Sequence, residues 1–363
     1  MLKEKCIITL MKVIFCHEFE LLKALSFGSI KNFGGIKTTT DDDIVELRRL
    51  GHQVSENAPF PDGSAPDVIA SSTFGPFTQM MLWRYKKRYP NAAVVQHAHT
   101  TAEDMKGGNF PMPESLAPAY IRQLYSFSDV LITPTEYSKK CLRKSGVNIP
   151  IYALSSGIHD ENLVPTPENR ARFRAFLKEK YHVPEDMFVV ANVGYTYLRK
   201  GIDRIYNVAK KMPHVFFIWP GQRVDNPYLA AGEKLPNMAF PGFYPDIRDV
   251  YYGADALFFP SYVENLGLPI IEAAMCHMPV VTSRIEAFDW IPEKSHCIKG
   301  EKIQEYIDGI NFLIEHPKER QEMVTRAYDL AMNLHSFKQI GHRMVKVYEK
   351  GIQAKKYTDA KKK

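Results

Sequence analysis

Short apolar runs alternate with amphipathic helical patterns along the whole chain, and this alternation constrains the fold more than any other feature. A buried apolar run followed by a helix is typical of the β-α-β unit, which builds parallel sheets with helices on both faces. The sequence therefore predicts an α/β protein. The expected strands cover residues 12–16, 68–70, 93–95, 130–132, 188–193, 215–219, 238–240, 256–259 and 279–282.

A polar, proline-bearing stretch near residues 160–185 interrupts the alternation and is typical of a linker. A length of 363 residues agrees with two domains at about 150 residues each. We therefore predict two Rossmann-like domains, residues 1–158 and 159–336. A basic and aromatic C-terminal helix follows at about residues 337–363, and its lysines from Lys355 onward are expected to form a disordered tail.

Composition excludes several classes of protein. With 45% hydrophobic and 24% charged residues, the chain is not disordered, and no uncharged apolar run of about 18 residues spans a bilayer. The apolar run 6–10 is too short for a signal peptide, and a start at Met11 rather than Met1 stays open. Five dispersed cysteines without a CxxC spacing indicate neither a disulfide framework nor a zinc site, so a cytoplasmic location is expected.

The most informative pattern lies in residues 258–274, where a predicted strand runs into a loop and then a helix that begins at Pro269. Ligands of open α/β sheets bind beyond the carboxyl ends of strands, and Gly267 lets backbone N–H groups approach an anion at the helix N-terminus. Glu272, in the first turn, can accept hydrogen bonds from a ribose, and Glu264 can accept them from a sugar. One glutamate alone fits a partner of the helix dipole, but two around one such loop favour a ligand site.

Two cations and two histidines follow other predicted strands. Arg199 and Lys200 lie after Gly194, where a helix begins. Cations there oppose the helix dipole, which favours an anionic ligand over a solvated surface role. His97 and His99 lie just past an apolar strand, on the same side by alternation, where a core histidine and an active-site histidine are both open interpretations.

The acidic residues near strand ends offer no pattern of metal ligands. Asp41, Asp42 and Asp43 are interpreted as the start and cap of a helix. Gly34 and Gly35, after the first strand, are a weak signal for a loop that lets the backbone approach a ligand. We therefore expect no metal and no other cofactor.

Several of these segments resemble the retaining GT-B glycosyltransferases of glycosyltransferase family 4. Glu264 and Glu272, with seven residues between them, match the E-x7-E signature of that family, and residues 96–104 look like a segment of its bacterial diglycosyl diacylglycerol synthases. The resemblance implies a GT-B fold, in which two Rossmann-like domains face a central cleft and the C-terminal helix crosses back to the N-terminal domain. It also implies that the N-terminal domain binds the acceptor and the C-terminal domain binds the nucleotide-sugar donor.

The resemblance also implies roles for individual residues. Lys200 and Arg199 would stabilise the leaving diphosphate, Glu264 would hold the donor sugar, and His99 would act near the acceptor, with Asp104 on the acceptor side. The expected donor-binding residues are Gly34, Gly35, Gly194, Asn265, Leu266, Gly267, Leu268 and Glu272.

The expected reaction is transfer of a hexose, glucose or galactose, from a nucleotide diphosphate sugar such as a UDP-sugar to a membrane glycolipid such as glucosyldiacylglycerol. Tyr195 departs from the arginine that many family members carry directly after the first glycine. A soluble sugar or polysaccharide acceptor, a nucleotide-sugar epimerase of similar fold, and a catalytically inactive nucleotide-sugar binding protein stay open as alternatives. A dehydrogenase is disfavoured because no GxGxxG follows either first strand.

The helix predicted at residues 77–89 bears on the partners of the protein. Its Trp83, Tyr85 and Tyr89 are interleaved with arginines and lysines, a mixture that suits the surface of an anionic bilayer. A core-facing aromatic stripe with a solvated basic face explains the same pattern equally well. A peripheral contact with the inner face of the cell membrane therefore stays open beside that alternative. Because no nucleic-acid-binding motif accompanies the helix, no nucleic acid partner is expected.

Overall fold

The structure, a computed structural model, describes residues 10–25, 34–106 and 113–360 of the chain. The chain divides into two compact units, each built on a six-stranded parallel sheet. Unit 1 takes the described residues of 1–102, 112–157 and 337–363, and unit 2 takes those of 103–111 and 158–336. The expectations for residues 1–9 and 361–363 lie outside the described residues.

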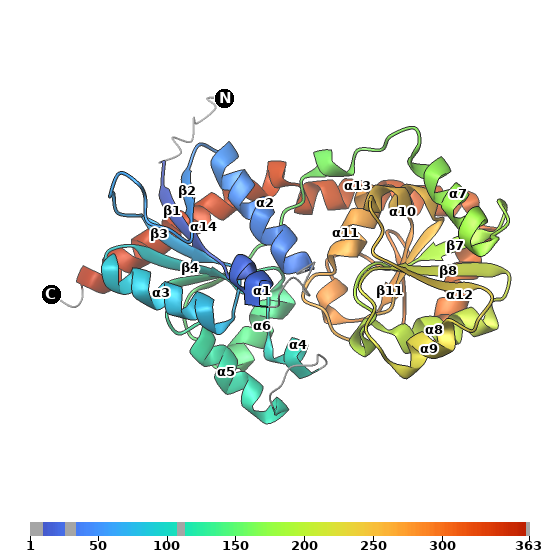
Figure 1. Cartoon of the computed structure of the whole chain (residues 1–363), viewed down its shortest axis with the longest axis horizontal. Helices are drawn as coiled ribbons and strands as arrows, with labels where there is room; N and C mark the ends of the chain where they lie inside the picture. The colour runs from blue at the N-terminus through green and yellow to red at the C-terminus, as the bar shows by residue number, and fades with distance from the viewer. Residues whose placement is uncertain (1–9, 26–33, 107–112, 361–363) are drawn as a thin grey trace. The chain divides into compact units, whose positions relative to one another are not determined.

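Unit 1 is a layered β-α-β domain (Figure 1). Its strand order is β2-β1-β3-β4-β5-β6. Its strands are β1 (Lys12–Cys16), β2 (Gln53–Glu56), β3 (Val68–Ser71), β4 (Ala93–His97), β5 (Val130–Thr133) and β6 (Ile151–Ala153). The helices between and after them are α1 (Phe19–Leu25), α2 (Gly35–Arg49), α3 (Pro76–Arg88), α5 (Ala117–Leu124), α6 (Glu136–Lys144) and α14 (Phe337–Ala360). Helix α4 (Ala102–Lys106) follows β4 in the sequence, but its residues from Glu103 onward group with unit 2.

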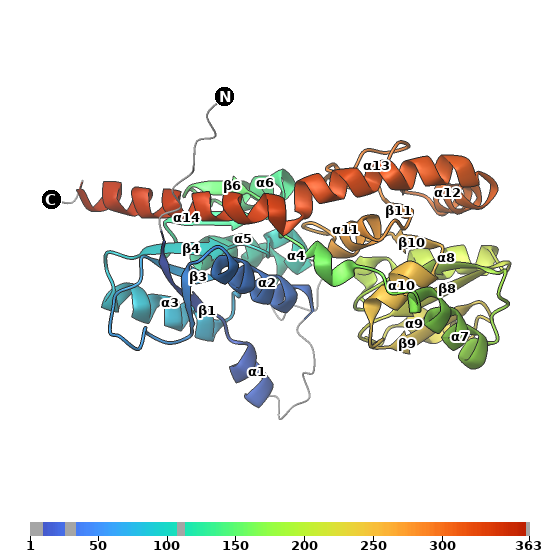
Figure 2. The same cartoon turned by 90° about the horizontal axis from the view of Figure 1, so that it is seen from above.

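Alternate residues of the first sheet face two different layers of helices. Val13 and Phe15 on β1 pack into a core with α2 and α14, whereas Ile14 and Cys16 pack into a second core with α3. The C-terminal helix α14 therefore lies along the sheet of unit 1 (Figure 2), with Tyr348 buried in the first of these cores. This position is the one that the family resemblance implies for the helix.

Unit 2 repeats the architecture with the strand order β12-β11-β10-β7-β8-β9. Its strands are β7 (Phe188–Ala191), β8 (Val215–Pro220), β9 (Met238–Gly242), β10 (Ala256–Phe259), β11 (Val280–Ser283) and β12 (Ile298–Gly300). Its helices are α7 (Asn169–Tyr181), α8 (Ile202–Lys211), α9 (Pro227–Gly232), α10 (Ile247–Gly253), α11 (Leu268–Met275), α12 (Ile303–Glu315) and α13 (Pro317–His335). Apolar residues of α8 and α12 share one core with alternate residues of β7, β8 and β10.

All the predicted strands are present, and the structure adds three short ones, β2, β6 and β12. Each of the three lies at an edge of its sheet and pairs with a single neighbour. An edge strand buries less of its surface than a central strand, so it does not require a continuous apolar run. Residues 53–56, for example, are exposed or only half-buried.

Two expectations about helix ends are wrong. Asp41, Asp42 and Asp43 do not cap a helix, because α2 already begins at Gly35 after Gly34, whose φ of 64° is accessible to glycine. Asp43 is instead buried in the middle of that helix. Nor is the segment from Lys355 a disordered tail, since α14 continues to Ala360 and Lys355 pairs with the carboxylate of Asp359 at 3.0 Å.

The helix predicted at residues 77–89 has the core-facing stripe that one interpretation expects, and its contact with a membrane stays a prediction. On α3, Met81, Tyr85 and Tyr89 pack against the core of the sheet, whereas Trp83 is 50% exposed. The Nζ of Lys87 lies 5.4 Å from the centroid of the Trp83 ring. Within the described part of the chain, none of the helices combines the length and apolar character needed to cross a bilayer.

Candidate active site

The strand order of unit 2 reverses between β10 and β7, which are hydrogen-bonded neighbours. At such a switch point the following loops diverge, and ligands bind beyond the carboxyl ends of the two strands. The loop after β7 ends in a short 3₁₀ helix, η3 (Leu198–Lys200), and the loop after β10 carries Glu264 to Gly267 before α11. The sheet thus brings two predicted sets of site residues to one place.

A buried ion pair joins these two loops. Lys200 Nζ donates a hydrogen bond to Glu264 Oε1, and Ser261 Oγ donates to the same oxygen at 3.0 Å. The side chains of Lys200 and Glu264 are 16% and 9% exposed, and Nζ lies 5.1 Å from the centroid of the Phe259 ring. Burial lowers the pKa of Lys200, while Glu264 opposes that shift. The pair places a cation and a carboxylate side by side.

Two glycines allow these loops to pack closely, Gly201 against the other loop and Gly267 against Phe288. A Cβ on Gly201, whose φ is 78°, would lie 2.2 Å from the carbonyl oxygen of Pro260. A Cβ on Gly267, whose φ is 80°, would lie 2.7 Å from the ring of Phe288. Leu268 begins α11 directly after Gly267, so the positive end of the helix dipole lies in the same loop. The loop can therefore receive an anionic group.

Glu272 lies on α11 but in the second turn rather than the first, because the helix begins at Leu268. The hydroxyl of Tyr251, on α10, donates a hydrogen bond to Glu272 Oε2. Burial raises the pKa of Glu272, and the hydrogen bond from Tyr251 opposes that rise. Burial also raises the pKa of Tyr251 well above its ordinary value, so its hydroxyl remains a donor.

The other predicted residues of unit 2 line the same two loops. Gly194 follows β7, and its carbonyl accepts a hydrogen bond from Trp219 Nε1 at 2.9 Å. Leu266 is buried, and Asn265 Nδ2 donates to the carboxylate of Asp104, a residue of α4 that groups with unit 2. Asp104, predicted for the acceptor side, therefore contacts the loop that carries Glu264.

Tyrosines occupy the remainder of the loop after β7. Tyr195, which departs from the arginine of the family pattern, stacks on Tyr197 with ring centroids 5.4 Å apart and planes at 6°. The guanidinium of Arg199 lies 5.9 Å from the centroid of the Tyr197 ring. It also donates a hydrogen bond to the carbonyl of Val263 at 3.4 Å. Arg199 thus lies between the two loops, beside Lys200.

In unit 1 a buried hydrogen-bond chain connects α2, β4 and α14. His97 Nδ1 lies 2.9 Å from Asp43 Oδ2, and His97 Nε2 lies 2.9 Å from Tyr348 Oη. Burial raises the pKa of Tyr348 well above its ordinary value, so the hydroxyl keeps its proton and can donate to Nε2. With Nδ1 as the donor to Asp43 and Nε2 as the acceptor from Tyr348, the His97 ring satisfies both contacts.

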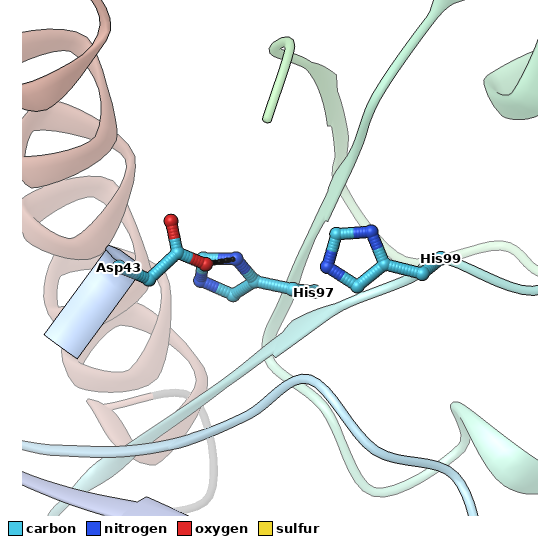
Figure 3. Close-up of side chains that lie close together, drawn as sticks. All are labelled: Asp43, His97 and His99. Atoms are coloured by element: carbon cyan, nitrogen blue, oxygen red, sulfur yellow. Dashed lines mark ion pairs between the residues drawn. The ribbon is translucent and has the colours of Figure 1, made fainter. Parts of the chain in front are cut away.

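His99 lies beside His97, which in turn lies beside Asp43 (Figure 3). All three residues line one cavity. The ring centroids of the two histidines are 6.2 Å apart. Burial lowers the pKa of His99 to about 4, with His97 acting in the same direction and Asp43 opposing it. His99 is therefore a neutral imidazole near pH 7. Gly34 and Gly35, at the start of α2, belong to unit 1 as well.

Asp43, His97 and His99 are residue types that bind zinc, and one ligand atom from each lies within 4.8 Å of the others. Both ring nitrogens of His97 are already within hydrogen-bond distance of Asp43 and Tyr348, however. An ion would have to displace one of these partners. The contacts agree better with a hydrogen-bond chain than with an open coordination site, and the absence of a metal stays a prediction.

Sequence reasoning missed the partners of the site residues rather than the residues themselves. Ser261 was detectable, because it follows the predicted strand end directly. Tyr251 and Tyr348 were not, since each reaches its partner only through the packing of elements that are separate in the sequence. The cap predicted at Asp41 to Asp43 is wrong because α2 begins six residues before Asp41.

Comparison with known proteins finds similar glycosyltransferases. The family model described as "Glycosyl transferases group 1" matches residues 173–330. The chain is 30% identical to the processive diacylglycerol alpha-glucosyltransferase of Acholeplasma laidlawii over 292 residues. The matched region covers 75% of this chain and 82% of that protein. It is 27% identical to the alpha-galactosylglucosyldiacylglycerol synthase of Streptococcus pneumoniae over 47% of this chain and 49% of that protein.

Solved structures resemble the chain over nearly its whole length. HepE of Anabaena, in complex with UDP and glucose, matches with a TM-score of 0.73 and 17% identity, covering 94% of this chain and 100% of that chain. At this identity the likeness concerns the fold alone. Together with the two parallel six-stranded sheets, it confirms the predicted GT-B class.

Proposed function

The chain belongs to the group 1 family of glycosyl transferases, and from this premise we propose that it transfers a hexose from a UDP-sugar to a membrane glycolipid. The hexose is glucose or galactose, the acceptor is a diacylglycerol glycolipid such as glucosyldiacylglycerol, and the anomeric configuration is retained. The two glycolipid enzymes among the relatives support the acceptor. The observation that carries the proposal is the buried Lys200–Glu264 pair beside the N-terminus of α11.

The geometry of unit 2 supports separate roles for its site residues in binding the donor. A diphosphate that leaves with its negative charge is stabilised by fixed cations and helix N-termini, which Lys200, Arg199 and the Gly267 loop provide. Glu264 would accept hydrogen bonds from the donor sugar, and Glu272 would accept them from the ribose. In unit 1, neutral His99 would contribute a polar nitrogen on the acceptor side.

We also propose that this reaction requires neither a metal nor another cofactor. Lys200 and the N-terminal end of α11 supply positive charge where the leaving diphosphate would lie, which is the task of a divalent cation in many other transferases. Transfer rates measured with and without EDTA test the proposal. Loss of transfer in EDTA that added Mg²⁺ or Mn²⁺ restores would contradict it.

A donor screen followed by product analysis tests the proposed reaction. UDP-glucose, UDP-galactose, GDP-mannose and ADP-glucose are compared by thermal shift, and the donors that bind are incubated with glucosyldiacylglycerol in mixed micelles. We expect a diglycosyl lipid whose new linkage is α by proton NMR. An epimerised nucleotide sugar, transfer to soluble sugars alone, or binding without turnover would each support one of the alternative functions instead.

Replacing Glu272 by alanine should weaken donor binding by about 10- to 100-fold, because a carboxylate accepting hydrogen bonds from a ribose is a charge-assisted contact. The measurement is the Kd of UDP by calorimetry. Glu315→Ala, an exposed glutamate at the end of α12, serves as the control and should bind like the native chain. Native affinity in Glu272→Ala would refute the assignment of this residue.

We further propose that the chain works at the cytoplasmic face of the membrane and docks through the exposed side of α3. That side carries Met80 and Trp83, 48% and 50% exposed, together with the exposed cations Lys87 and Arg88. An apolar and aromatic patch beside basic residues suits the interface of an anionic bilayer. Glucosyldiacylglycerol would then be reached without leaving its membrane.

The double substitution Lys87→Glu/Arg88→Glu should reduce binding to phosphatidylglycerol-containing vesicles at least tenfold, at roughly 1 kcal/mol for each basic residue near the surface. Vesicle flotation gives the bound fraction. Lys210→Glu/Lys211→Glu changes the same charge on α8, where both lysines are also exposed, and should keep most of the binding. An equal loss in both variants, or no binding of the native chain to anionic vesicles, would overturn the assignment.

A further inference from the structure

Tyr251 is buried, only 2% exposed, and belongs to α10, outside the predicted donor-binding residues. Its hydroxyl donates to Glu272 Oε2 on α11. We propose that Tyr251 is a positioning residue, which holds the Glu272 carboxylate in the orientation that receives the two ribose hydroxyls of the nucleotide. The inference rests on the proposed function, because it concerns the same donor site.

The chemistry of a carboxylate leaves room for this role. An ionised carboxyl group has about four lone-pair sites on two oxygens, so one donor on Oε2 leaves capacity for a vicinal diol. The terminal torsion of a glutamate is broad, and without a fixed donor the group samples many orientations. A hydrogen bond from a rigid, buried phenol restricts that sampling before the ligand arrives, which reduces the ordering cost of binding.

The charge of Glu272 also depends on this contact. Burial raises the pKa of Glu272, and the hydrogen bond from Tyr251 is the contact that opposes the rise. The ionised form accepts stronger hydrogen bonds from hydroxyl groups than the protonated form does. Tyr251 therefore favours both the orientation and the ionisation state in which Glu272 binds a diol.

The adjacent tyrosine shows what a structural contact looks like in the same helix. Tyr252 Oη donates to the backbone carbonyl of Leu163 at 2.7 Å, which satisfies a half-buried hydroxyl and ties α10 to the segment Asp160–Leu163. Tyr251 instead donates to a side chain of the E-x7-E pair. The two tyrosines are one residue apart and have different partners, so they form a matched pair for experiment.

The test compares Tyr251→Phe with Tyr252→Phe in the full chain. The Kd of UDP and of 2′-deoxy-UDP is measured by calorimetry for each. The native chain should prefer UDP, because the deoxy compound lacks one of the hydroxyls that Glu272 receives. Tyr251→Phe should weaken the binding of UDP by about tenfold and the binding of 2′-deoxy-UDP far less, so this variant should lose most of the preference for UDP. Tyr252→Phe should keep the preference. In turnover, Tyr251→Phe should raise the donor KM more than it lowers kcat.

Several outcomes decide the matter. If Tyr251 had a purely structural role, Tyr251→Phe would weaken the binding of UDP and of 2′-deoxy-UDP equally, and the preference for UDP would be unchanged. That result would overturn this inference alone. Absence of UDP binding by the native chain would overturn the proposed function as well. In a Glu272→Gln background the additional effect of Tyr251→Phe should disappear, because the two residues act as one unit, and an additive effect would count against the proposal.

Discussion

Lys200→Met should lower kcat by about 100- to 1,000-fold, the loss typical of removing one preorganised group that stabilises developing negative charge. Lys200 is the buried cation at the junction of the β7 and β10 loops, and its Nζ already contacts the carboxylate of Glu264. Charge on the leaving diphosphate grows as the sugar bond breaks, so a fixed cation there acts mainly on the transition state. Steady-state kinetics with the donor and acceptor that support transfer give the measurement.

Stability must be separated from catalysis in this variant, because removing one partner of a buried pair leaves Glu264 uncompensated. Thermal unfolding of Lys200→Met shows how much of the protein remains folded under assay conditions, and the rate is corrected for that fraction. Lys211→Met, on the exposed end of α8, is the matched control and should retain native activity. A corrected kcat within threefold of the native value would remove Lys200 from the proposed mechanism.

Lowering the pH from 7 to 4 should cost the protein roughly 3 kcal/mol of folding free energy through His335 alone, at 1.36 kcal/mol for each pKa unit. His335 is 2% exposed at the end of α13, with its ring centroid 4.4 Å from that of Trp290, and burial lowers its pKa from 6.5 to about 3. Between the pKa of the unfolded state and that of the folded state, His335 is protonated in the unfolded chain and neutral in the folded chain. Stability therefore rises with pH across this window and falls on acidification.

His99 in unit 1 acts in the same direction, since burial lowers its pKa to about 4. Denaturant titrations at several pH values between 7 and 4 give the free energy of unfolding. His335→Gln should flatten the dependence in this range, whereas His214→Gln, at an exposed position before β8, should leave it as in the native chain. A slope that is identical in His335→Gln and the native chain would show that another group governs the acid response.

The central strands of both sheets could be predicted because burial on two faces demands continuous apolar residues. Residues 130–132 and 256–259 have no polar side chain, and both lie in the interior of a sheet. The edge strand β2 contains Gln53 and Glu56 and carries no such signature. The beginning of α2 at Gly35 could not be predicted either. The helix follows Gly34, whose φ is positive, and this backbone conformation leaves no pattern in the polar residues that come after it.

The candidate site was predictable where chemistry follows a strand directly in sequence. Lys200, Glu264 and Gly267 each lie in a loop after a central strand, and parallel sheets place those loops at the same edge. The partner of each group was not predictable. Ser261 is adjacent in sequence, but Tyr251 belongs to a preceding helix, and nothing in its local pattern distinguishes it from Tyr252.

The sequence by itself determined the α/β class and the residues that can carry chemistry, because strand periodicity and loop composition are local properties of the chain. The tertiary structure decided which of those residues act on one another. It placed Lys200 against Glu264, Tyr251 against Glu272, and Tyr348 of the last helix against His97. His97 and Tyr348 are 251 positions apart in the sequence and meet only through packing. The burial that results from packing shifts pKa values in the candidate site.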